Sequence, residues 1–176
     1  MPLPVTTCEP ARYCPAPILS SPSSVELERY TQNFRNGRGA LSEYYKLLDR
    51  FAELESKLVR AGRLSRNWNS YGAEPPDVQA VEMARLTLRW LREAFLPPRQ
   101  LAASAEGGIV LCFTENQRYA DIEILNTGEI SMAMYERGSE VEEPVIEIGS
   151  DEESLRGAIA SIREHQTQAQ KTLELC

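Results

Sequence analysis

Two carboxylates on one predicted strand are the residues of this chain with the clearest potential for chemistry. Asp121 and Glu123 alternate with apolar residues over 119–125, which places both side chains on one face of the strand. A carboxylate pair acts as general acid and base, or holds a divalent metal, when a cleft raises the pKa of one member. The spacing indicates no cleft. A solvated face is the simplest interpretation, an acidic face that binds a basic partner is the functional one, and a metal-dependent hydrolase or nuclease is an alternative.

No other catalytic arrangement is indicated. Acyl transfer needs a nucleophile, a base and an orienting group, and the single histidine, His165, is expected near the solvated end of the last helix. The sequence contains no G-x-S-x-G, H-E-x-x-H or phosphate-binding glycine motif. Its four cysteines lack the spacing of a zinc site, and Cys112 reads as a small buried side chain. We predict a protein without enzymatic activity, bound metal or cofactor.

The charge of the chain argues against a nucleic-acid partner. The formal net charge is −7, whereas nucleic-acid binders usually carry a basic excess. A local cluster of Arg60, Arg63 and Arg66 keeps nucleic-acid binding open as an alternative. No apolar run approaches the roughly 20 residues of a membrane helix, and the first residues do not resemble a secretory signal. With free thiols typical of a reducing compartment, a cytoplasmic location away from membranes is the expectation.

A polar loop over residues 67–72 holds two large aromatic side chains, Trp68 and Tyr71. Each can bury a large apolar area while one polar atom finds a hydrogen-bond partner. We favour anchoring of the loop to the core, with a protein interface as the second interpretation and base stacking as the third. Pro75-Pro76 then predicts the start of a helix, with Asp77 in its first turn.

The segment around this loop carries a pattern that extends into the next strand. Trp68 to Pro75 reads W-N-S-Y-G-A-E-P, a predicted helix follows, and the next strand begins with Gly107-Gly108. The pattern resembles a set of uncharacterised small bacterial proteins that carry W-[DN]-x-Y-G-A-x-P, a helix and a strand starting with two glycines. The resemblance covers Trp68 to about Tyr135, and where that set has a tryptophan late in the strand this chain has Leu111-Cys112-Phe113. It implies a fold pattern and a bacterial or mobile-element origin, and no activity.

A strongly amphipathic helix is predicted over residues 40–61. Its apolar residues recur at helical spacing, and the apolar face is wide for a helix that packs on one neighbour. Packing on the core of its own chain alone is the simpler interpretation; the functional one is that the helix packs on the sheet and also on a partner chain, with Tyr44, Tyr45 and Phe51 among the contacts.

Four short strands are predicted, over 109–113, 119–125, 129–136 and 145–148. Short turns between them favour an antiparallel meander with one covered face and one wet face. Residues 100–105 read as a linker of small residues. The predicted fold class is α+β: a two-layer domain in which a four-stranded antiparallel meander sheet is packed by two or three helices.

The chain is predicted to hold one domain with two appendages. Residues 1–24 are rich in proline and serine and are expected to form a flexible arm. Residues 25–166 form the single α+β domain, which begins with a short helix over 25–34. Its last helix is expected to start at a capping box made by Ser150 and Glu153, and residues 167–176 are expected to fray.

These observations predict a non-catalytic protein-binding module: an adaptor, an inhibitor or antitoxin-like protein, or an accessory subunit. A setting in bacterial defence or a mobile element is implied by the resemblance alone. The partner is expected to be another protein or a second copy of the chain. The expected contact residues are Trp68, Tyr71, Tyr44, Tyr45, Phe51, Asp121 and Glu123.

Overall fold

The computed structural model describes residues 40–137 and 145–173. The predicted arm over 1–24 and the predicted helix over 25–34 lie outside the described residues. The described elements are, in chain order, α2 (Ala40–Ala61), α3 (Val78–Glu93), β1 (Gln100–Ala103), β2 (Gly108–Glu115), β3 (Arg118–Leu125), β4 (Ile130–Glu136), β5 (Ile146–Ile148) and α4 (Glu152–Leu173).

The strands form one antiparallel sheet of five strands in the order β1-β2-β3-β4-β5. The predicted α+β class and antiparallel sheet are confirmed, but the expected number of four strands is one too few. The additional strand is β1, which was predicted as a linker because its Gln-Leu-Ala-Ala sequence has no strand pattern of its own. It becomes a strand by pairing with β2, where Leu101 lies opposite Leu111 and Ala103 opposite Ile109.

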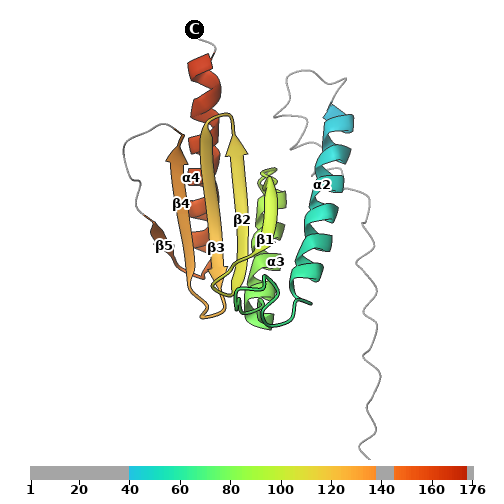
Figure 1. The fold of residues 1–176 in the computed structure, drawn as a ribbon. Coiled ribbons are helices and arrows are strands. Elements are labelled where there is room, and N and C mark those ends of the chain that lie inside the picture. The colour runs from blue at the N-terminus through green and yellow to red at the C-terminus, as the bar shows by residue number, and fades with distance from the viewer. Residues whose placement is uncertain (1–39, 138–144, 174–176) are drawn as a thin grey trace, which may run out of the picture.

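The described helices lie against one face of the sheet, and none of them covers the other face (Figure 1). In that view α3 and α4 lie behind the strands, while α2 stands beside the edge strand β1 and packs on α3. Alternate strand residues on the covered side meet the helices in one core. The fully buried members of this core with the largest side chains are Phe51, Leu54, Leu58, Leu88, Leu91, Ile109, Leu111, Phe113, Ile122, Ile124, Leu155 and Ile162.

Side-chain caps fix where two of the helices begin. Asp77 is the N-cap of α3, and its carboxylate accepts a hydrogen bond of 2.7 Å from the backbone N–H of Ala80. At α4 the cap is Asp151, which accepts bonds from the backbone and hydroxyl of Ser154 at 2.9 and 2.6 Å. The predicted capping box at Ser150 is therefore wrong by one residue. α4 extends to Leu173, so most of the segment predicted to fray belongs to this helix.

Candidate partner-binding surface

The open side of the sheet brings together the side chains that point away from the helices. Read from the strand register, these residues are Gln100, Ala102, Val110, Cys112, Thr114, Tyr119, Asp121, Glu123, Leu125, Ser131, Ala133, Tyr135 and Glu147. The single basic strand residue, Arg118, belongs to the covered side, where it donates a 2.6 Å hydrogen bond to the backbone carbonyl of His165. We call the open side, with its charged residues Asp121, Glu123 and Glu147, the acidic sheet face.

The middle of the acidic sheet face carries small and partly apolar side chains. Ala102, Val110, Cys112 and Ala133 lie on adjacent strands, and each is half-buried although no helix covers it. Small side chains let another backbone approach the sheet closely. An open face that only has to meet water more commonly carries long charged side chains of both signs.

A thiol, a phenol and a carboxylate lie close together in the middle of the acidic sheet face. Tyr119 donates a 3.3 Å hydrogen bond to the Sγ atom of Cys112, and Asp121 lies opposite Cys112 in the strand register. Burial raises the pKa of the Asp121 carboxyl, against hydrogen bonds from Tyr119 and the backbone of Ala133 that lower it. Burial likewise raises the pKa of the Cys112 thiol and of the Tyr119 hydroxyl. The thiol is therefore a poor nucleophile, and within the described residues Asp121 forms no ion pair that compensates its charge.

The two sequence-predicted carboxylates share the face but have different surroundings. Glu123 accepts a 2.5 Å hydrogen bond from the hydroxyl of Ser104, a buried residue of the turn between β1 and β2. That bond connects the end of the acidic sheet face at which β3 ends to this turn. At the other end, Tyr119 stacks on Tyr135 with 4.6 Å between ring centroids and 28° between ring planes. The face is thus framed by an aromatic pair and a fixed carboxylate.

The loop that carries Trp68 and Tyr71, residues 67–77, is built from side-chain-to-backbone hydrogen bonds, and we call it the tyrosine loop. Asn69 accepts bonds from the backbone N–H groups of Tyr71 and Ala73 at 2.9 and 3.2 Å. Asn67 accepts one from the N–H of Gly72 at 2.7 Å. The indole of Trp68 donates to the backbone carbonyl of Glu74 at 3.3 Å.

Trp68 and Tyr71 have opposite roles in this loop. Trp68 is half-buried, in keeping with the anchoring that the sequence suggested. Tyr71 is 91% exposed, so the prediction that its ring anchors the loop to the core is wrong for this residue. Ser70 and Gly72, on either side of Tyr71, have φ angles of 64° and 88°, so the tyrosine lies at a tight turn of the loop.

Asn126 fastens the tyrosine loop to the end of the sheet, a role that sequence reasoning missed. Its amide accepts a 2.8 Å bond from the N–H of Asp77 and donates a 2.9 Å bond to the carbonyl of Pro75. Gly107 makes room for this contact, because a Cβ atom there would lie 2.7 Å from Asn126 Nδ2 and 3.3 Å from Glu74 Cβ. The first glycine of the Gly107-Gly108 pair is thus required by the loop.

The remaining predicted contacts of α2 divide between core and surface. Phe51 is buried in the core of the single chain and Tyr44 is also buried, so the structure offers neither to a partner. Tyr45 is exposed and meets Tyr44 edge to face, with 6.2 Å between ring centroids.

The predicted arginine cluster lies at the end of α2 and in the segment that follows. Arg60, Arg63 and Arg66 are all exposed, and Arg66 forms an ion pair of 3.0 Å with Glu74 of the tyrosine loop. The pairing leaves Arg60 and Arg63 as the available charges, fewer than the run of phosphate contacts that nucleic-acid binding usually needs.

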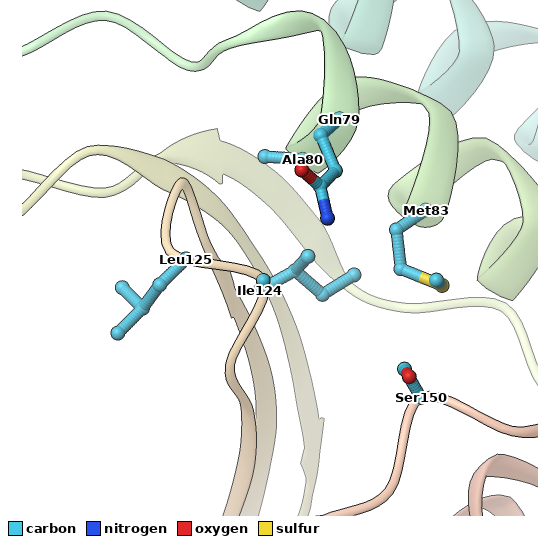
Figure 2. Close-up of a pocket in the computed structure, with 7 residues that line it drawn as sticks. Gln79, Ala80, Met83, Ile124, Leu125 and Ser150 are labelled. Carbon is cyan, nitrogen blue, oxygen red and sulfur yellow. The ribbon is translucent and has the colours of Figure 1, made fainter.

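The pocket drawn in Figure 2 lies between the start of α3 and the end of β3. Its volume is about 70 Å³, and its lining is Gln79, Ala80, Met83, Ile124, Leu125, Gly128 and Ser150. The lining holds no titratable side chain, and the space suits a few water molecules rather than an organic substrate. This pocket therefore offers no acid or base that could activate its one hydroxyl group, that of Ser150.

The described residues contain neither a metal-binding cluster nor a membrane-spanning helix. No group of three or more His, Cys, Asp or Glu side chains in 40–137 and 145–173 is arranged to hold a metal ion. None of the helices in that part of the chain is long and apolar enough to span a membrane. Comparison of the chain with models of protein families, with curated proteins and with solved structures found no match.

Proposed function

We propose that this protein is a binding module without catalysis, and that its acidic sheet face binds a basic surface of a partner protein. An adaptor, an inhibitor of antitoxin type or an accessory subunit would each work in this way. A setting in bacterial defence or a mobile element remains part of the proposal on the strength of the sequence resemblance.

The observation that carries the proposal is the state of Asp121. This carboxylate is half-buried on an open face, its pKa is raised by burial, and no cation pairs with it among the described residues. Keeping a charge that is offset only by hydrogen bonds in such a place costs folding free energy. A cation supplied by a partner would pair with Asp121 and remove that cost, so the free energy lost on folding would be recovered on binding.

The rest of the acidic sheet face supports the same kind of partner. Glu123 is held in place by Ser104, and Glu147 adds a third charge from β5. On the open side of the described strands, no lysine or arginine lies beside them. A second copy of the same face would bring like charges together, so a basic protein surface is the better fit.

The location of the binding surface can be tested by photo-crosslinking. A benzophenone amino acid would replace Ala133, in the middle of the acidic sheet face, or Arg89, an exposed residue of α3, in the full chain in its source cells. The proposal predicts one prominent crosslinked protein from position 133 and none from position 89. Equal crosslinking from both positions, or none from 133, would overturn it.

The role of charge is then tested with the purified crosslinked protein. The pair D121N/E123Q should weaken binding by roughly 30-fold, about 2 kcal/mol, and reduce the dependence of affinity on salt. The matched control is D49N/E164Q, which removes two exposed charges from α2 and α4. Equal losses for the two pairs would show that only the net charge matters and would refute a specific acidic face.

A further inference from the structure

Tyr71 is a large side chain that contributes almost nothing to the folded domain. It is 91% exposed, the largest exposed fraction among the large apolar side chains of the described residues. Aromatic side chains lower the free energy of folding or binding when they are desolvated, and Tyr71 stays in water. Its presence on the surface is therefore not explained by the fold.

The backbone that presents Tyr71 is stiff before any partner arrives. Three bonds from the side chains of Asn67 and Asn69 hold the N–H groups of Tyr71, Gly72 and Ala73. Ser70 has a φ of 64°, a conformation that costs free energy for a residue other than glycine. A tyrosine on such a loop loses little conformational freedom on binding, which is the property of an interface anchor.

The tyrosine loop adjoins the acidic sheet face. Ser104 in the turn between β1 and β2 bonds Glu123, and three residues later Gly107 lies against Glu74 of the loop. Figure 1 shows the loop at the end of the sheet where β3 ends and β2 begins. One partner can therefore reach both surfaces.

The size of the sheet face indicates that a partner must extend beyond it. β2 and β3, with eight residues each, make the sheet about 26 Å long at its middle, and five strands make it about 19 Å wide; because β1 and β5 are shorter, the face covers less than roughly 500 Å². A stable protein interface covers about 800 Å² on each side. The tyrosine loop lies where the missing area can be supplied.

We propose that Tyr71 is an aromatic anchor that enters an apolar pocket on the same partner protein whose basic surface covers the acidic sheet face. The inference rests on the proposed function and adds the shape of the partner: a basic patch beside a pocket for one phenol ring. Glu74 and Asp77 of the loop and Glu106 next to Gly107 carry three negative charges, of which Arg66 pairs with that of Glu74, and the remaining negative charge disfavours a nucleic-acid phosphate at this place.

Stability measurements separate an anchor from a structural residue. Y71A should unfold at the same urea concentration as the wild type, because the ring makes almost no contact with the fold. A urea midpoint clearly below that of the wild type would show a structural role and overturn the inference.

Crosslinking and affinity then test the anchor itself. A benzophenone amino acid at position 71 should capture the same protein as one at position 133. Y71A should weaken binding of that purified protein at least 30-fold, whereas V78A, at a position that is 80% exposed, should change it less than about threefold. N69A, which removes two bonds under the loop and leaves the ring intact, should fall between the two.

The outcomes distinguish the two proposals. Capture from 133 with unchanged binding by Y71A would overturn the anchor and leave the acidic face standing. Capture from 71 alone would overturn the acidic face, and with it the shared partner. Capture of RNA or DNA at 71 in place of protein would overturn the anchor in favour of base stacking.

Discussion

The attachment of the tyrosine loop to the sheet depends on one side chain, and N126A is the change that removes it. The Asn126 amide makes two bonds, 2.8 Å from Asp77 N and 2.9 Å to Pro75 O. A typical intramolecular hydrogen bond stabilises a protein by about 0.5–1.5 kcal/mol, so N126A should cost about 2 kcal/mol. At 2–4 °C per kcal/mol, the melting temperature should fall by about 6 °C.

Urea unfolding gives the cost, and amide exchange shows where it arises. The midpoint should fall while the slope m stays the same, because the fold itself is unchanged. The amide of Asp77 should exchange faster, whereas the amide of Gly72 should keep its protection, since Asn67 within the loop holds it. The loop would then remain stiff internally and lose its fixed orientation.

N126D is the matched control. Aspartate keeps the acceptor for Asp77 N–H but places a carboxylate oxygen against the Pro75 carbonyl, so it should cost at least as much as N126A while the Asp77 amide keeps its protection. If N126A unfolds within about 0.5 kcal/mol of the wild type and Asp77 keeps its protection, the sheet does not position the loop through Asn126. The same result would remove the physical link between Tyr71 and the acidic sheet face.

Three other predictions follow from the geometry. G108A should lose about 3 kcal/mol or more in urea unfolding, because its Cβ would lie 2.1 Å from the carbonyl of Ile124 at a φ of 134°, whereas G157A, in an open helical position, should gain about 1 kcal/mol. D121N should be more stable than the wild type by about 0.5 kcal/mol at pH 7. The folded state raises the pKa of Asp121, so ionisation of this carboxyl destabilises the folded state. The advantage of D121N should fade as the pH falls through that raised pKa towards the ordinary value near 3.9. Cys112 should react with iodoacetamide roughly tenfold more slowly in the native protein than in urea, measured on its peptide by mass spectrometry, because burial raises the pKa of its thiol.

The sequence predicted those parts of the fold that have a local pattern. The alternation in 119–125 placed Asp121 and Glu123 on one face, and the structure has them there. The helix over 40–61 has the predicted bounds. β1 was missed because its pairing with β2, rather than its own residues, makes it a strand. Asp151 was missed as a cap because Ser150 beside it has equally good capping chemistry.

The candidate site was harder to predict because it depends on contacts distant in sequence. Asn126 looked like an ordinary turn residue, and its partners lie 49 and 51 residues earlier in the chain. For Tyr71 the sequence left two interpretations, a ring packed on the core and a contact with a partner, and its 91% exposure, at a turn where Ser70 has a positive φ that serine rarely adopts, rules out the first. No periodicity in the sequence predicts the contacts of Asn126 or the outward orientation of Tyr71.

The two surfaces proposed for binding share a thermodynamic property that the core does not have. Tyr71 leaves a ring in water, Ser70 holds a strained φ, and Asp121 keeps a desolvated charge without a cation among the described residues. Each feature lowers the stability of the free chain or adds nothing to it, and one basic partner with an apolar pocket would desolvate the Tyr71 ring and neutralise the Asp121 charge. Such features are expected where function rather than folding selects the residue, because other residue types at these positions would give a more stable free chain. Stability and binding should therefore change in opposite directions for D121N, and stability alone should be unaffected by Y71A.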